Sequence, residues 1–343
     1  MQSPRKTRYT RAVAAALVAV ACASAGAADK YVLISHAPDS DSWWNTIKNA
    51  IKQAGEDFGV EVDYRNPPNG DLADMARLIE QGAARNYNGV ITSIADYDVL
   101  KSAMGKVTAK KIPLITINSG TTQQSESLGA IMHVGQPEYE AGKGAGMKAK
   151  AAGIKSFVCV DHQATNDGLM QRCKGFADAI GADISKSLLD TGEDPVTVES
   201  KVSAYLRNNP GTQAILTVGP SGAVPTLKAL EKAGKYGKIW LATFDLTPEI
   251  SAAIKNGGMQ FAIDQQPYLQ GYIPVAVMAI MKRDKTTDIG KVQAALKADK
   301  KFAARLAEYG LAPAYGPRHI GSGPGFVTKE NIGKVEQYAG QYR

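Results

Sequence analysis

Apolar runs of strand length alternate with amphipathic segments along almost the whole chain after residue 30. The segment 43–58 is typical, because Trp43, Ile47 and Ile51 recur at the spacing of a helix that buries one face. Strands are predicted at 31–35, 60–64, 89–94 and 113–118, with helices at 43–58, 71–85 and 99–110 between them. Strands that alternate with helices favour a parallel sheet with right-handed crossovers and helices on both faces.

The same pattern begins again in the second half of the chain. Strands are predicted there at 155–160, 184–189, 214–218 and 239–244, and helices at 142–151, 167–180, 196–208, 223–233 and 247–256. The predicted fold class is therefore α/β, with two similar doubly wound parallel-sheet lobes.

Short polar segments near His133 and Gln265 look like crossovers between the lobes, since no Pro- or Ser-rich linker separates the two halves. A chain that passes between lobes more than once predicts a multi-strand hinge. The expected first lobe is 28–134 plus 265–316, and the expected second lobe is 135–264 plus 317–343. Within these parts we expect a helix at 268–283, a charged helical segment at 288–308 and an irregular tail at 313–326.

The first 27 residues have the three parts of an export signal. Four basic residues precede the ten-residue apolar run 12–21, and small residues at 25–27 favour cleavage near Ala27. The apolar run is too short to cross a bilayer, which needs about 20 residues. A lipoprotein signal at Cys22 is disfavoured, because the leucine expected three positions earlier is missing. A periplasmic location follows, outside the reach of cytoplasmic ATP and NADH, which argues for binding without a cofactor.

The charge distribution argues against nucleic-acid binding, and the histidine spacing argues against a metal site. The formal charge of +7 falls to +3 without the four basic residues of the leader, and the remaining lysines are scattered among acidic residues. A nucleic-acid-binding protein usually has a basic stripe, so no nucleic acid is expected. The four histidines have no metal-ligand spacing, so no metal site is expected.

Two cysteines, Cys159 and Cys173, remain after removal of the leader. An exported protein enters an oxidising compartment, where an even number of cysteines favours a disulfide. Cys159 lies in a predicted strand and Cys173 on the next helix, so a bridge is geometrically reasonable. Two buried thiols that do not meet are the open alternative.

Polar and aromatic side chains follow several of the predicted strands. Open parallel sheets bind ligands beyond the carboxyl ends of their strands, so these loops predict a binding site directly. Carboxylates and amides match hydroxyl groups that both donate and accept, and aromatic rings stack on the C–H faces of sugars. The candidate ligand-binding residues are Asp41, Trp43, Trp44, Asp96, Asn118, His162, Asn166, Asp167, Asp245 and Gln265.

Structural roles are open alternatives for some of these residues. Adjacent helical positions differ by 100°, so Trp43 and Trp44 cannot both face one core, and at least one is expected in the cleft. Asp245 could instead cap the helix that follows it, although Thr247 is placed to do so. For His162 a buried structural role competes with ligand contact.

Several segments together resemble the periplasmic sugar-binding proteins of ABC importers, in the type I group that includes ribose-, galactose- and inositol-binding proteins. Segment 41–44 (DSWW) resembles that family's Asn-Pro-Phe-Phe segment, whose aromatic rings sandwich the sugar. Segment 112–118 (IPLITIN) resembles its IPVITLD strand, with Asn118 in place of a ligand-binding aspartate. Segments 172–176 (RCKGF) and 243–245 (TFD) resemble its RxxGF and VGFD, and 262–267 resembles the crossover that carries a ligand-binding glutamine, here Gln265.

The resemblance covers nearly all of 31–270 and implies two lobes that close on a monosaccharide or polyol. It also implies delivery to a membrane permease by a monomer, with a chemoreceptor as a further partner. Ser119 and Met170 stand where ribose binders have arginines, and Gly219 replaces an Asn or Asp, so ribose itself is disfavoured. His162, Asn166 and Asp167 are expected to supply other partners.

Other function classes find less support in the sequence. No GxSxG or GxGxxG motif is present, and the paired carboxylates Asp39 and Asp41, which could serve a glycosidase, suit binding equally well. A sugar-responsive repressor would need an N-terminal helix-turn-helix where the leader stands. A binding protein for a sugar-like signalling molecule is the alternative that shares the expected site. No enzymatic activity is expected.

Overall fold

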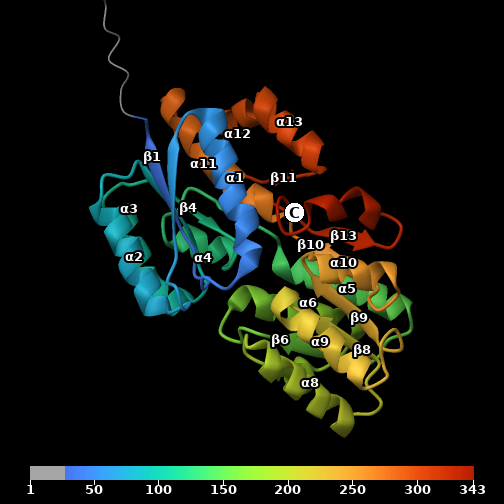
Figure 1. Ribbon diagram of the computed structural model, residues 1–343. Coiled ribbons are helices and arrows are strands. Elements are labelled where there is room, and N and C mark those ends of the chain that lie inside the picture. Colours follow the sequence, from blue (N-terminus) through green and yellow to red (C-terminus); the bar gives the residue numbers. More distant parts are fainter. Residues whose placement is uncertain (1–27) are drawn as a thin grey trace, which may run out of the picture.

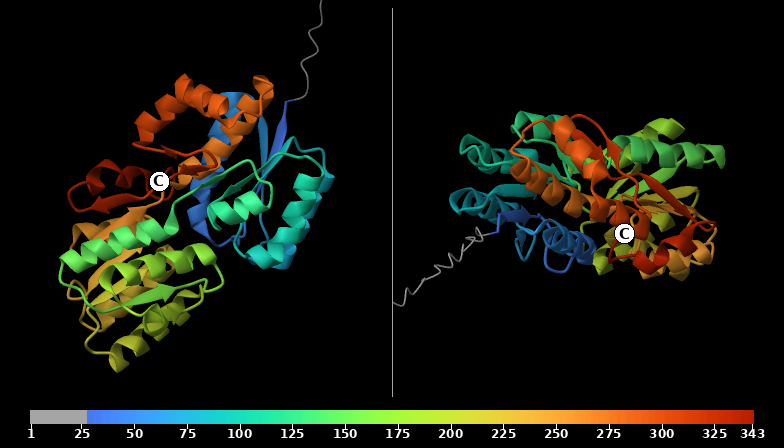
Figure 2. Two further views of the ribbon diagram at one scale, coloured as in Figure 1. Left: turned by 180° about the vertical axis from the view of Figure 1, so that it is seen from behind. Right: turned by 90° about the horizontal axis from the view of Figure 1, so that it is seen from above.

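The computed structural model describes residues 28–343, so the expected signal peptide at 1–27 and Cys22 lie outside the described residues. The chain forms two lobes, each with a central sheet covered by helices on both faces (Figure 1). Figure 2 shows the same two lobes from behind and from above. The strand orders are β11-β12-β5-β4-β3-β1-β2 and β13-β10-β9-β8-β6-β7. The predicted α/β class with two doubly wound lobes is confirmed.

The first lobe holds the seven-stranded sheet. Its strands are β1 (Lys30–Ile34), β2 (Glu61–Arg65), β3 (Gly89–Ser93), β4 (Leu114–Ile117), β5 (His133–Gly135), β11 (Ala314–Tyr315) and β12 (His319–Gly321). Its helices are the 3₁₀ turn η1 (Ser42–Trp44), α1 (Asn45–Phe58), α2 (Leu72–Ala84), α3 (Tyr97–Ala109), α4 (Thr122–Ser127), α11 (Pro267–Arg283), α12 (Ile289–Ala298) and α13 (Lys300–Tyr309).

The second lobe holds the six-stranded sheet. Its strands are β6 (Phe157–Asp161), β7 (Leu188–Asp190), β8 (Ala214–Thr217), β9 (Trp240–Phe244), β10 (Phe261–Asp264) and β13 (Gly325–Thr328). Its helices are α5 (Glu138–Ala151), α6 (Asp167–Ile180), α7 (Ile184–Ser187), α8 (Pro195–Asn208), α9 (Pro220–Lys232) and α10 (Pro248–Lys255), followed by the 3₁₀ turns η2 (Ile332–Lys334) and η3 (Glu336–Tyr338).

Burial on both faces explains why the strands are continuously apolar. Successive side chains of a strand point to opposite faces of the sheet. In β1, Tyr31 and Leu33 join the apolar cluster beneath α1 and α11, whereas Val32 and Ile34 join the cluster beneath α2 and α3. All four are buried, and a fully buried side chain of this kind stabilises the fold by about 1.5–3 kcal/mol.

Three crossovers form the hinge between the lobes. The chain leaves the first sheet after β5, returns after β10 and leaves again between β12 and β13. The third crossover therefore falls at residues 322–324, later than the boundary at 316/317 expected from the sequence, because His319–Gly321 pairs in parallel with β5. The last residue also contacts both lobes, since Arg343 pairs with Asp264 at 2.6 Å and donates to the carbonyl of Tyr309 at 2.8 Å.

The strand predicted at 184–189 is only partly correct. Residues Ile184–Ser187 form the short helix α7, and only Leu188–Asp190 forms the strand β7. Asp183 starts the helix by accepting a hydrogen bond from the backbone N–H of Ser185, and the Ser187 hydroxyl donates to the Asp183 carbonyl. These local side-chain bonds compete with strand pairing.

The C-terminal region also differs from expectation. The segment 288–308 forms two helices, because Asp299 ends α12 and caps α13 through the backbone N–H of Phe302. The tail predicted to be irregular contains β11, β12 and β13, of which β13 pairs antiparallel with β10. Such short strands depend on distant partners and have no local pattern that would predict them.

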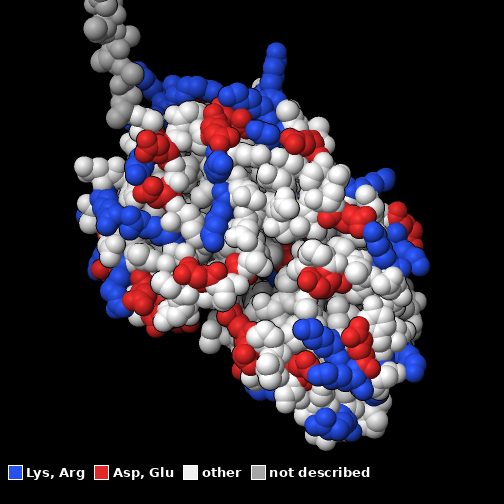
Figure 3. All heavy atoms as spheres, in the orientation of Figure 1, with Lys and Arg blue, Asp and Glu red and all other residues white. Residues whose placement is uncertain are grey.

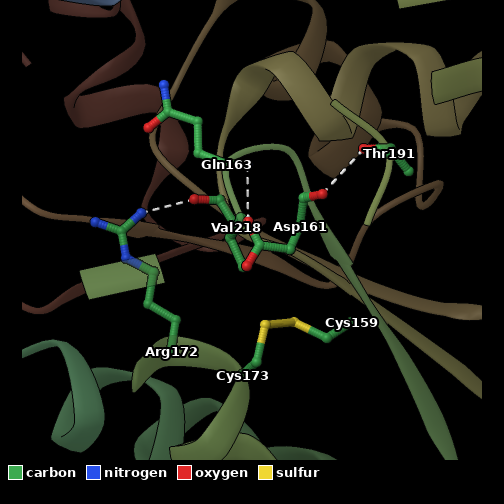
Figure 4. Close-up of a disulfide and its surroundings, with 7 residues drawn as sticks. All are labelled: Cys159, Asp161, Gln163, Arg172, Cys173, Thr191 and Val218. Atoms are coloured by element: carbon green, nitrogen blue, oxygen red, sulfur yellow. Dashed lines mark hydrogen bonds between the residues drawn. A yellow bond between two sulfur atoms is a disulfide. The ribbon is translucent and has the colours of Figure 1, made fainter. Parts of the chain in front are cut away.

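The predicted disulfide between Cys159 and Cys173 is confirmed. It joins β6 to α6 with the two Cα atoms 5.8 Å apart, and both cysteines are buried (Figure 4). A cross-link that closes a loop of this length stabilises a protein by about 3 kcal/mol in the chain-entropy model. The bridge anchors α6, whose N-terminal end carries the candidate site residues Asn166 and Asp167.

No helix in residues 28–343 is long and apolar enough to span a bilayer.

Candidate functional site

A cavity lies between the lobes, at the carboxyl ends of strands from both sheets, as expected for open parallel sheets. Its volume is about 60 Å³, so the cavity is narrow in this conformation. Acidic side chains border the junction of the two lobes in Figure 3. The first lobe contributes His36, Asp41, Trp43, Trp44, Asn118 and Ser119. The second lobe and the crossover contribute Glu138, His162, Asn166, Arg172, Asp245 and Gln265.

The two tryptophans reach the cavity from the short turn η1. Asp41 precedes this turn and accepts a hydrogen bond from the backbone N–H of Trp43 at 3.0 Å. The Trp43 and Trp44 rings meet edge to face with their centroids 5.3 Å apart. Trp44 is buried in the core of the first lobe, whereas Trp43 is half-buried, and both rings line the cavity. The pair therefore supplies an aromatic wall.

Asn118 and Asp245 occupy equivalent positions in the two lobes. Asn118 directly follows β4 and Asp245 directly follows β9, and both have left-handed backbone, with φ of 59° and 66°. Asn and Asp tolerate this conformation better than most residues, and such backbone is concentrated at functional sites. The turn aims one polar side chain from each lobe at the cavity.

A buried ion pair forms the back of the cavity. Arg172 donates from Nε and Nη2 to the two carboxylate oxygens of Glu138, at 2.7 and 2.8 Å. Its Nη1 donates to the carbonyl of Val218 at 2.6 Å, next to the disulfide in Figure 4. Burial acts to lower the pKa of Arg172, but the negative charge and hydrogen bonds of Glu138 outweigh this effect. The net result is a raised pKa, so the guanidinium stays charged.

Close helix packing creates this ion pair. A Cβ at Gly142 would lie 2.1 Å from the carbonyl oxygen of Arg172, and one at Gly175 would lie 2.1 Å from that of Tyr139. Only glycine permits α5 and α6 to approach so closely. Gly142 and Gly146 of this segment therefore serve the packing of α5 against α6, which agrees with the absence of a phosphate-binding motif.

Asp245 is the most perturbed carboxylate in the cavity wall. It is 4 % exposed, and burial raises its pKa from 3.8 to about 7, while Arg172 acts in the opposite direction. One oxygen accepts from Gln265 Nε2 at 2.7 Å. The other, Oδ1, has no hydrogen-bond partner among residues 28–343. The indole N–H of Trp43 is near enough to lower the pKa of Asp245, but it forms no hydrogen bond within normal distance and angle limits.

Asp41 and the two histidines are also shifted by burial. Burial raises the pKa of Asp41 to about 6, and it lowers the pKa of both His36 and His162 to about 4. Both imidazoles are therefore neutral at pH 7. The Nδ1 atom of His36 is bonded to the Ser93 hydroxyl at 2.8 Å, whereas Nδ1 of His162 has no partner in the described part of the chain.

An amide network links the cavity to the hinge. Asn118 Nδ2 donates to Gln270 Oε1 at 3.1 Å, and Gln270 Nε2 donates to Gln265 Oε1 at 3.1 Å. Gln265 in turn donates to Asp245, and Gln270 also donates to Ser322 in the third crossover at 3.0 Å. The polar side chains that face a ligand are therefore held by the same residues that form the hinge.

Two of the residues predicted to bind ligand are not among the cavity-lining residues. Asp96 caps α3 by accepting from the backbone N–H of Val99 at 3.1 Å. Asp167 is exposed at the start of α6, where it accepts from Gln124 Nε2 of the first lobe at 2.9 Å. The structure does bring together the other eight, namely Asp41, Trp43, Trp44, Asn118, His162, Asn166, Asp245 and Gln265.

Several hydrogen bonds join the lobes directly. They include the bond from Gln124 to Asp167 and one from Asn166 Nδ2 to the Ser119 hydroxyl at 3.0 Å. Each bond has one partner in each lobe and needs the lobes to be close together. The described conformation is therefore a closed one.

Sequence reasoning missed Glu138 and the site role of Arg172. Arg172 was visible only as part of the RCKGF segment, and Glu138 had no signal because its partner is 34 residues away. Among residues 28–343, no group of three or more His, Cys, Asp or Glu side chains is arranged to hold a metal ion.

Comparison with known proteins decides the family. A family model described as a periplasmic binding protein domain matches residues 31–286. The chain belongs to this family. The ribose import binding protein of Haemophilus influenzae is 24 % identical over 301 residues, which cover 86 % of this chain and 98 % of that protein. The D-allose-binding periplasmic protein of Escherichia coli is 22 % identical, and the match covers 71 % of this chain and 81 % of that protein.

Two solved structures have the same architecture as this chain. A carbohydrate transporter from Acidothermus cellulolyticus, solved in complex with myo-inositol, is 27 % identical with a TM-score of 0.78, and the match covers 92 % of this chain and 99 % of that one. The glucose-galactose binding protein GanP from Geobacillus stearothermophilus is 21 % identical with a TM-score of 0.70, covering 89 % and 98 %.

Proposed function

We propose that this periplasmic binding protein captures a monosaccharide or related polyol between its lobes and delivers it to the membrane permease of an ABC transporter. The cavity between the lobes carries the proposal, because its wall combines hydrogen-bonding side chains from both lobes with an aromatic pair. Carboxylates and amides match the hydroxyl groups of a polyol, and tryptophan rings match its C–H faces. Relatives named for ribose and allose, and a neighbour holding myo-inositol, support this ligand class.

Ligand binding is proposed to favour the closed arrangement of the lobes. A ligand shifts a conformational equilibrium only through its difference in affinity for the two states. A polyol that contacts Asn118 in the first lobe and Asp245 in the second makes both contacts only when the lobes are closed. The three crossovers of the hinge allow this movement without breaking either core.

The proposed cellular setting follows from the export signal and the family. Removal of residues 1–27 near Ala27 would release a monomer into the periplasm, where the closed lobes would dock on the permease and could also dock on a chemoreceptor. No turnover of the ligand is proposed. Asp39, one of the paired carboxylates that could serve a glycosidase, is not among the cavity-lining residues and accepts a hydrogen bond from Asn66 at 2.9 Å.

A thermal-shift screen tests the proposed function. The mature protein is heated with a panel of pentoses, hexoses and cyclitols, and at least one is expected to raise the melting temperature, because binding to the native state adds RT ln(1 + [L]/Kd) of stability. Chromatography of the mixture should recover that compound unchanged. A flat response across the panel, or conversion of the bound compound into a product, would contradict the proposal.

Asp167→Ala is expected to weaken binding of the selected polyol two- to fivefold without any contact between Asp167 and the ligand. The substitution removes one cross-lobe hydrogen bond, and an exposed bond of this kind contributes about 0.5–1 kcal/mol. Stopped-flow measurement should place the change in the release rate. Asp98→Ala, an exposed change on α3 outside the cleft, is the matched control and should bind as the unmodified protein does.

A further inference from the structure

The charges that face the cavity do not balance. Asp41, Glu138 and Asp245 line it, and Arg172 is the only lysine or arginine among the described lining residues. His36 and His162 add no charge at neutral pH, because burial lowers the pKa of each to about 4. One cation therefore faces three carboxyl groups.

Arg172, the single cation, already forms hydrogen bonds with protein acceptors. Four of the five N–H groups of Arg172 donate to protein acceptors, two of them to Glu138, one to the Val218 carbonyl and one to Gln265 Oε1 at 3.3 Å. The bidentate pair with Glu138 is almost fully buried, with side chains 4 % and 7 % exposed. Arg172 is paired with Glu138, and neither Asp41 nor Asp245 forms an ion pair in the described part of the chain.

Asp245 is the lining carboxylate that a cationic ligand group would stabilise most. Its Oδ1 atom has no hydrogen-bond partner among residues 28–343, although the residue is 96 % buried and lines the cavity. The other charged groups that act on it are Arg172, which is held by Glu138, and Asp264, which is paired with Arg343 at 2.6 Å. No free basic side chain of the described chain reaches this oxygen.

Asp41 faces the same cavity from the first lobe. The charged groups that act on it are Glu193, which disfavours its ionised form, and Lys48, which favours it. Lys48 lies over the Tyr64 ring, with Nζ 4.8 Å from the ring centroid, and is not among the lining residues. The aromatic wall of Trp43 and Trp44 lines the same cavity and would itself attract a cation.

We infer that the cavity prefers a polyol bearing one protonated amino group, such as an amino sugar or an aminocyclitol, with the ammonium group at Asp245. This inference rests on the proposed capture of a polyol and names its charge class. An ammonium group donates up to three hydrogen bonds and offsets a buried carboxylate, whereas a hydroxyl donates only one and leaves the charge in place. Sugar acids and sugar phosphates are disfavoured, because they would bring further negative charge close to Asp41 and Asp245.

Calorimetric titration with matched ligands tests the preference at about pH 7. The probes are glucosamine, galactosamine and an amino-inositol, each compared with its neutral parent, with N-acetylglucosamine as the uncharged amide at the same ring position, and with glucuronate as the anion. At least one amine is expected to bind tenfold or more tightly than its neutral parent, and the anion is expected not to bind. In Asp245→Asn the advantage of the amine should fall to twofold or less. Asp96→Asn, which alters a helix cap outside the cavity, should retain it.

The outcomes separate this inference from the proposed function. Neutral parents that bind as tightly as their amines in every pair, or an anion that binds best, would overturn the amine preference while leaving polyol capture intact. An amine preference that persists in Asp245→Asn would overturn the placement of the ammonium group. Absence of binding for every probe, charged or neutral, would count against the proposed function itself.

Discussion

Asp245→Asn is expected to lower the affinity for the captured polyol by about 10- to 100-fold. The carboxylate offers its free oxygen to the ligand, and hydrogen bonds to charged groups contribute about 1.5–3 kcal/mol. Asparagine is the informative replacement because it tolerates the left-handed backbone at this position, where φ is 66°. Alanine would add backbone strain to the loss of the contact. Titration calorimetry measures the affinity, and near-unchanged binding would remove Asp245 from the site.

The same substitution is expected to stabilise the unliganded protein at alkaline pH. Burial raises the folded-state pKa of Asp245 from 3.8 to about 7, so the unfolded chain releases a proton that the folded protein retains between these values. Stability therefore falls as the pH rises from about 4 to about 7, by on the order of 4 kcal/mol for a shift of this size. The melting temperatures of the two proteins should be similar at low pH, with the variant higher at pH 8. A parallel pH dependence in both would contradict this account.

Arg172→Met is expected to reduce the free energy of unfolding by about 3–5 kcal/mol. Removal of one partner from a buried ion pair leaves the other charge without compensation, and here Glu138 would keep only the hydrogen bond from Gln136 at 2.7 Å. The carbonyl of Val218 would lose its partner as well. Urea denaturation followed by circular dichroism measures the change.

Two further variants distinguish the effect of losing the ion pair from a non-specific loss of stability. Arg172→Met combined with Glu138→Gln removes both charges and should recover part of the loss. Lys101→Met breaks the exposed pair between Lys101 and Asp98 and should change the free energy of unfolding far less than Arg172→Met does. If Arg172→Met costs no more than Lys101→Met, the buried pair does not stabilise the fold in the way described.

Much of the fold could be predicted because each central strand is buried on both faces. Apolar runs such as the one around Val32 and Ile34 require a layer of helices on each side, and the alternation of elements then fixes a parallel sheet. The short strands of the tail could not be predicted in this way. Their pairing with β5 and β10 depends on partners far away in the sequence, and no local periodicity distinguishes them from loop.

A site residue could be predicted correctly where a polar residue follows a strand and does not cap the next helix. Asp96 and Asp245 look alike in the sequence, since each stands between a strand and a helix. Asp96 caps α3, whereas Thr247 caps α10 through the backbone N–H of Ile250 at 3.2 Å and leaves Asp245 free. The sequence contains the alternative cap in the second case, and this is what distinguishes the two aspartates.

The roles of residues that depend on tertiary contacts could not be predicted from the sequence. The pairing of Glu138 with Arg172 requires the close approach of α5 and α6 at Gly142 and Gly175. The placement of Asp167 against Gln124 depends on how far the lobes are closed. Neither distance follows from spacing along the chain.

A crystal structure with a polyol selected by the thermal-shift screen tests the central claim most directly. The account predicts the ligand between the lobes, stacked against Trp43 and hydrogen-bonded to Asn118 of the first lobe and Asp245 of the second. Electron density for the ligand outside this cavity, or for a compound held by one lobe alone in an open protein, would contradict it.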